Sequence, residues 1–210
     1  MLNITKKLTN ECWKGKNTKR YIIVHHTGSK TGTTLTNMVK FFTRWDYISV
    51  HYIVGLKGEV VQTIREDDRA WHAGRSEWHG TKSLNNHSIG IEVVSDGYYY
   101  TDKQRQAVQE LCRDIMGRNN IPIINVLRHA DIAPRRKWDI GEGFYVKKWG
   151  SWDGFQTSLL SQGNDENIQR LEKMYHIQAD VTSDDLAVLN NIKKELAQAK
   201  GVKYTPHEIT

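Results

Sequence analysis

The stretch Tyr21-Ile22-Ile23-Val24-His25-His26 does most to decide the fold of this 210-residue chain. It opens with four apolar residues, three of them β-branched, which predicts a strand buried inside a sheet. Residues 89–94 (IGIEVV) and 121–127 (IPIINVL) predict two further strands. Apolar residues recur at helical spacing in residues 34–45 and 101–117. Strands that alternate with helices in this way predict an α/β domain.

A hairpin interrupts this alternation. Residues 51–54 and 59–64 are rich in β-branched residues, and the sequence Gly-Leu-Lys-Gly at 55–58 connects them. The expected fold class is therefore α/β, with a mixed central β-sheet flanked by helices. Thr101 is a suitable N-cap for the longer helix, and Gly117 lies near its end.

Residues 161–210 differ in composition from the rest of the chain. They hold six Lys and Arg against eight Asp and Glu, a net charge of −2. Because the whole chain has a net charge of +6, residues 1–160 have a net charge of +8. All seven tryptophans and seven of the nine histidines also lie in residues 1–160. We therefore expect a catalytic or binding domain at 1–160 and a small helical C-terminal extension at 161–210.

Two helices are expected in the extension. Residues 164–175 suit a short helix, and Thr182 or Ser183 can cap a second one. The second helix would carry an apolar stripe formed by Leu186, Leu189, Ile192 and Leu196. Such a stripe packs on the parent domain or on a second copy of the chain, so self-association through these helices is one prediction.

Composition excludes several classes of protein. With 38% hydrophobic and 26% charged residues, the chain is neither disordered nor fibrous. No apolar run approaches the ~18 residues that a membrane-spanning helix needs, so no integral membrane segment is expected. Residues 1–20 contain no apolar stretch, so we expect no secretory signal and synthesis in the cytoplasm. Two cysteines cannot build a disulfide framework or a four-cysteine zinc site.

The positive charge of residues 1–160 favours an acidic polymer as partner, whether nucleic acid, an anionic membrane surface or an anionic cell wall. Charge alone does not choose among these. Nucleic acid is disfavoured because the chain has no helix-turn-helix, zinc-finger or RNP-type motif.

Three residues suggest a metal site. His25 ends the first predicted strand, His129 lies just past a later one, and Asp139 follows ten residues on. Neighbouring strands lie about 5 Å apart, so side chains at their ends can converge. A catalytic zinc takes three such ligands and keeps a fourth position for water. By itself this pattern is weak, since histidines often serve only as structural hydrogen-bonding groups.

Five motifs in one order give the pattern more weight. They are Val24-His25-His26-Thr27, the hairpin His51-Tyr52-Ile53-Val54 with Gly58-Glu59-Val60 and Gln62, Trp71-His72-Ala73-Gly74, Asn86 with Ser88-Ile89-Gly90-Ile91-Glu92, and the segment from His129 to Gly141. Together they resemble the zinc N-acetylmuramoyl-L-alanine amidases, the amidase-2 family. That family includes phage lysozyme-type amidases, cell-wall recycling amidases and peptidoglycan-recognition proteins. The resemblance covers about residues 20–158.

The resemblance implies a Zn²⁺ ion held by His25, His129 and Asp139. Water activated by the metal would attack the amide between N-acetylmuramic acid and L-alanine. Glu92 matches the family's general base, and Lys137 matches the lysine that stabilises the oxyanion. The alternative for Glu92 is a surface carboxylate on a strand, and for Lys137 a solvated member of a basic run.

Four further residues are predicted to bind substrate. Trp71 and His72 match the segment that lines the family's groove, and His26 would lie beside that groove or behind the metal ligands. Trp138 stands where the family carries a small polar residue, so it would narrow or roof the site. The family's usual Lys-Thr-Asp-Pro-Gly is Lys-Trp-Asp-Ile-Gly in residues 137–141, and the loss of proline frees one backbone angle of that loop.

The favoured function is a peptidoglycan-cleaving amidase of the endolysin kind, encoded by a phage or prophage, made in the cytoplasm and reaching the wall after the membrane is breached. The main alternative is a cytosolic recycling amidase that acts on soluble anhydro-muropeptides. A non-catalytic peptidoglycan-binding module is a third reading, which Glu92 and Asp139 disfavour. Peptidoglycan or a muropeptide is the expected partner in all three cases.

Overall fold

A six-stranded mixed sheet forms the centre of the computed structural model, which describes residues 2–44 and 47–160. The strand order is β1-β4-β3-β7-β2-β8. β3 and β4 run antiparallel, and every other neighbouring pair is parallel. The strands are β1 (Ile4–Lys6), β2 (Tyr21–His26), β3 (Tyr52–Val54), β4 (Val60–Gln62), β7 (Ser88–Val93) and β8 (Val126–Arg128), with a separate hairpin of β5 (Glu77–Trp78) and β6 (Thr81–Lys82).

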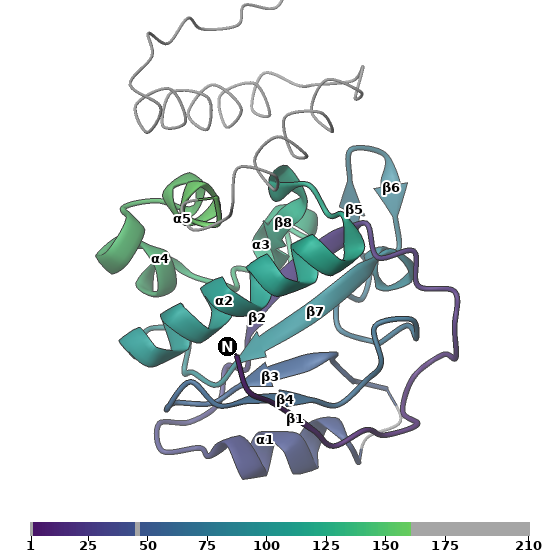
Figure 1. Ribbon diagram of the computed structural model, residues 1–210, viewed down its shortest axis with the longest axis horizontal. Coiled ribbons are helices and arrows are strands. Elements are labelled where there is room, and N and C mark those ends of the chain that lie inside the picture. The colour runs from purple at the N-terminus through teal and green to yellow at the C-terminus, as the bar shows by residue number, and fades with distance from the viewer. Residues whose placement is uncertain (1, 45–46, 161–210) are drawn as a thin grey trace, which may run out of the picture.

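Helices cover both faces of the sheet (Figure 1). In the described part of the chain they are α1 (Leu35–Phe42), α2 (Asp102–Asn119), α3 (His129–Ile132), α4 (Glu142–Trp149) and α5 (Trp152–Ser158), with 3₁₀ turns at Leu84–Asn86 and Ile123–Asn125. α2, α4 and α5 share the larger core with β2 and β7, whereas α1 packs with β3 and β4 in a second apolar cluster. The predicted α/β class with a mixed sheet is confirmed.

Local sequence signals explain most of the boundaries. Thr34 and Thr101 each cap a helix through a reciprocal hydrogen-bond pair with the residue three positions on. Asn120 ends α2 in the left-handed conformation. The strand predicted at 121–127 is wrong in its first part, because Pro122 lacks an N–H and leads into a 3₁₀ turn.

Strand alternation decides which side chains reach the functional face. His25 of β2 and Glu92 of β7 are register partners and lie on the same face, since successive side chains point to opposite faces. The neighbouring Val24 and Ile91 point the other way, into the larger core. Two polar side chains therefore meet on the face of the sheet opposite the larger core.

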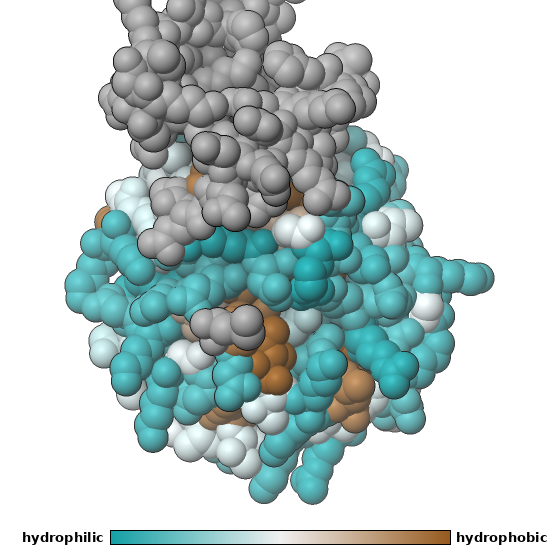
Figure 2. All heavy atoms as spheres, viewed as in Figure 1, coloured by the Kyte–Doolittle hydropathy of each residue, from teal (hydrophilic) through white to brown (hydrophobic). Residues whose placement is uncertain are grey.

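The extension predicted at 161–210, with its two helices, lies outside the described residues. Within the described part, no helix has the length and hydrophobicity needed to cross a bilayer. The face of the molecule in Figure 2 is mainly hydrophilic, with small separate hydrophobic patches.

Candidate metal centre and active site

Two paired parallel strands bring the candidate ligands together. β2 pairs with β8, so His25 near the end of β2 lies next to His129, which directly follows β8 and begins α3. The loop after α3 folds back, and the Asp139 carbonyl accepts a 2.6 Å hydrogen bond from the Ala130 N–H. His25, His129 and Asp139 are all buried, with exposed fractions of 1, 2 and 6%.

One ligand atom from each of these three residues points to a common position. The Nδ1 atoms of His25 and His129 are 2.8 Å apart, and they lie 3.2 and 3.0 Å from Asp139 Oδ2. Among the residues that the structure describes, this is the one cluster of histidine, cysteine or carboxylate side chains with such convergence.

The opposite nitrogen of His25 is held by a second histidine. Ser88 Oγ donates to the Leu84 carbonyl at 2.6 Å, so it accepts from His72 Nε2 at 3.2 Å. This assignment leaves His72 Nδ1 to accept the hydrogen bond from His25 Nε2–H at 2.9 Å. His25 therefore presents an Nδ1 lone pair to the cluster.

His129 is oriented in the same way by the backbone. Its Nε2–H donates to the Ala73 carbonyl at 3.1 Å, so its Nδ1 also carries a lone pair. Burial lowers the pKa of His25 to about 4. Burial alone would raise the pKa of Asp139, but the hydrogen bonds with His129 and His25 outweigh it and lower that pKa.

These protonation states suit a cation. Neutral imidazoles and an ionised carboxylate are the forms that bind a metal, and two lone pairs 2.8 Å apart repel each other unless a positive charge lies between them. Two nitrogens and one oxygen are a typical donor set for catalytic zinc. The residues present therefore fit the metal that the sequence implies.

Glu92 lies beside this cluster with an unused oxygen. Its side chain is buried, and Oε2 has no hydrogen-bond partner among the described residues. Burial raises the pKa of Glu92 well above its ordinary value, the charge of Asp139 raises it further, and Lys137 lowers it. A buried carboxyl without a partner is a candidate proton acceptor for a group that the substrate brings.

Comparison with known proteins identifies the scaffold. Residues 15–142 match the family model described as N-acetylmuramoyl-L-alanine amidase. The chain belongs to this family. The 1,6-anhydro-N-acetylmuramyl-L-alanine amidase AmpD of Enterobacter cloacae is 34% identical over 139 residues, which cover 65% of this chain and 71% of AmpD.

Solved structures of an amidase and of an endolysin share the fold. The complex of Escherichia coli AmiD with anhydro-N-acetylmuramic acid-L-Ala-D-gamma-Glu-L-Lys is 29% identical, with a TM-score of 0.59, and covers 91% of this chain and 75% of that one. A mutant endolysin from Bacillus subtilis is 25% identical, with a TM-score of 0.57, and covers 76% of this chain and 99% of that one. AmpD and AmiD are named as amidases, enzymes that cleave amide bonds.

The predicted substrate-binding residues of this amidase-family chain lie at different places around the cluster. His26 and Trp138 pack edge-on against each other with ring centroids 4.4 Å apart. Trp71 is half-buried and packs edge-on against Trp13 at 5.8 Å. His72 is 8% exposed and contacts His25 from behind. Their contacts with substrate stay predictions.

A basic groove adjoins the cluster on the His129 side and was missed in the sequence. Arg136 donates to the carbonyls of Ala73 and Arg75 at 2.9 and 2.8 Å, and Ala73 is also the partner of His129. The groove is lined by residues that include Arg75, Lys82, Arg135, Arg136 and one acid, Glu77. The sequence shows the basic run Arg135-Arg136-Lys137, but only the fold brings Arg75 and Lys82 to the same groove.

Proposed function

We propose that this chain is a zinc-dependent N-acetylmuramoyl-L-alanine amidase. It would hydrolyse the amide between the lactyl group of N-acetylmuramic acid and L-alanine. The observation that carries the proposal is the meeting of three buried ligand atoms, from His25, His129 and Asp139, beside the unpartnered carboxyl of Glu92. Membership of the family and the substrate named in the AmiD complex support the same reaction.

Glu92 and Lys137 have different roles in the proposed reaction. Zinc, when bound, acidifies a coordinated water and polarises the scissile carbonyl. Glu92 takes the proton from the attacking water and returns it to the leaving nitrogen of L-alanine. Lys137 is near enough to lower the pKa of Glu92, and its ammonium would stabilise the negative charge that develops on the carbonyl oxygen.

The basic groove supports an acidic peptide as the leaving group. The stem peptide in the AmiD complex contains D-gamma-Glu, whose α-carboxylate is free. Arginines pair readily with carboxylates, often through two hydrogen bonds. We therefore place the peptide of the substrate in the groove of Arg75, Lys82, Arg135 and Arg136.

The test compares wild type with Asp139→Ala. Bound metal is measured by native mass spectrometry, and new L-alanine amino termini are measured after incubation with purified muropeptides. Wild type should hold one zinc and release amines, and the variant should lose both. Asp67→Ala, at an exposed position whose carboxylate pairs with Lys19 alone among the described residues, is the matched control. A wild type that binds zinc and muropeptide without cleavage would instead support the non-catalytic module.

The size of the substrate that the enzyme cleaves distinguishes a recycling amidase from an endolysin. AmpD-type similarity supports the recycling of soluble anhydro-muropeptides, and the endolysin likeness supports cleavage of the intact wall. Incubation with both substrates separates these alternatives. Cleavage of anhydro-muropeptides with intact sacculi left untouched would refute the endolysin setting.

A further inference from the structure

An exposed aromatic surface adjoins the metal cluster. Trp138 precedes the ligand Asp139, yet 53% of it is exposed, and its indole packs on His26. Tyr98 is 78% exposed, and its ring centroid lies 5.6 Å from that of Trp138, at an interplanar angle of 37°. We call these two side chains the aromatic platform. Large rings exposed next to each other mark a binding surface more often than isolated ones do.

Two glycines hold the indole of Trp138 in place. Gly97 has φ of +97°, and a Cβ added there would collide with the indole ring. A Cβ at Gly141 would lie 3.0 Å from the same ring. The backbone thus packs directly against one side of Trp138. A ring fixed in this way loses little conformational entropy when a ligand stacks on it.

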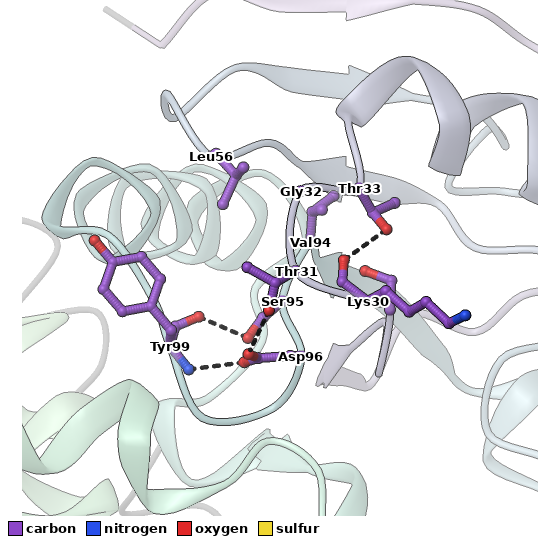
Figure 3. A pocket seen from close by; sticks show the side chains of 10 residues that line it. Lys30, Thr31, Gly32, Thr33, Leu56, Val94, Ser95, Asp96 and Tyr99 are labelled. Carbon is purple, nitrogen blue, oxygen red and sulfur yellow. Dashed lines mark hydrogen bonds between the residues drawn. The ribbon is translucent and has the colours of Figure 1, made fainter.

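The loop that carries Tyr98 is also fixed. Asp96 Oδ1 accepts hydrogen bonds from the N–H groups of Tyr98 and Tyr99 at 3.0 and 2.9 Å, and Ser95 Oγ donates to the Tyr99 carbonyl at 2.7 Å. Tyr99, the next residue, lines a separate hollow of about 150 Å³ with Leu56, as Figure 3 shows. The loop therefore sends Tyr98 to the platform and Tyr99 away from it.

Charge separates the platform from the basic groove. The carboxylates of Asp139 and of the partly exposed Asp96 lie near the platform together with one cation, Lys137, whereas the groove adjoins His129 and holds Arg135 and Arg136. The substrate has the same division, because its peptide bears carboxylates and its N-acetylated sugars are neutral. An acidic peptide is attracted to the groove, which leaves the platform for the sugar.

We propose that Trp138 and Tyr98 form a sugar-binding subsite, which stacks on a pyranose ring of the glycan attached to the scissile amide. The C–H groups on one side of a pyranose present positive edges to the electron-rich face of an aromatic ring. The inference rests on the proposed function for the identity of the substrate. It adds that the glycan runs over the platform and the peptide through the groove.

The experiment compares two substrates that share one stem peptide. One carries the peptide on an N-acetylglucosamine–N-acetylmuramic acid disaccharide, and the other carries it on a lactoyl group without sugar. The ratio of their kcat/KM values is measured in wild type, Trp138→Thr and Trp138→Phe. The ratio should fall about tenfold in Trp138→Thr, the loss expected for one aromatic stacking contact, and Trp138→Phe should restore most of it. Tyr99→Ser, in the same loop but facing the hollow, should retain the wild-type ratio.

Direct binding separates this inference from the proposed function. Isothermal titration calorimetry with a peptide-free tetrasaccharide of the same two sugars should give about tenfold weaker binding for Trp138→Thr than for wild type. If wild type hydrolyses neither substrate, the proposed function fails, and the titration still tests the platform. If Trp138→Thr keeps both the substrate ratio and the tetrasaccharide affinity, the platform does not bind sugar.

Discussion

Zinc affinity should depend on His72, although this residue is not expected to touch the metal. His72 Nδ1 accepts the hydrogen bond from His25 Nε2–H at 2.9 Å, and both side chains are buried. Burial lowers the pKa of His72 well below its ordinary value, so it remains neutral and able to accept. His72→Leu removes this acceptor at similar volume, whereas His72→Asn supplies an oxygen near the position of Nδ1.

The size of the effect follows from the geometry. Without His72, the N–H of His25 is buried and unpaired, at a cost of about 1–3 kcal/mol. That cost corresponds to a rise of about 5- to 150-fold in the dissociation constant for zinc. Partners of metal-binding histidines generally contribute about 10- to 100-fold to affinity, which agrees with this range.

The assay is competition for zinc with a chromophoric chelator at pH 7.5, with folding of the metal-free protein checked by circular dichroism. His72→Leu should bind zinc about 10- to 100-fold more weakly, and His72→Asn should remain within a few-fold of wild type. His87→Leu is the control, because its ring contacts Thr18 at the surface and none of the ligands. Equal zinc affinity in wild type and a folded His72→Leu would refute the argument.

Substitutions at four other residues test the roles of the general base, the oxyanion group, the basic groove and a buried arginine. Glu92→Gln should retain zinc and lose about 10²- to 10⁴-fold in kcat. The raised pKa of Glu92 means that the folded protein favours the neutral carboxyl, so the metal-free protein loses stability as pH rises and this carboxyl ionises. Glutamine stays neutral, so Glu92→Gln should raise the Tm of metal-free protein more at pH 8 than at pH 4. Lys137→Met should lower kcat by about 10²- to 10³-fold at unchanged zinc content, and an unchanged kcat would exclude Lys137 as the oxyanion group. Arg135→Glu should raise KM for acidic muropeptides several-fold at low salt, with the difference shrinking in high salt, as steady-state kinetics would show. Arg105→Met should reduce the free energy of unfolding by about 3 kcal/mol in urea titrations, because buried Arg105 donates to the carbonyls of Tyr100, Gly143 and Phe144.

The sequence predicted local elements well where one signal dominated. Thr101 and its partner three residues on defined the start of α2, and the glycines at 55–58 defined the hairpin. The conformation of the segment after Pro122 was harder to predict, because its apolar residues suit a strand as well as a turn. The structure has a 3₁₀ turn there, which a side chain of α5 stabilises. Gln156 of α5 donates to the carbonyls of Ile123 and Val126, a contact that no local pattern predicts.

For the site, the sequence by itself determined the residue types and their order: two histidines, a glutamate, a lysine and an aspartate in motifs that belong to one family. Only the tertiary structure decided what surrounds them. The pairing of β2 with β8 sets the approach of the two Nδ1 atoms, and the chain of Ser88, His72 and His25 sets which nitrogen faces the cluster. Such contacts join residues far apart in the chain, and their geometry depends on how strands pair and loops close, which residue spacing alone does not encode.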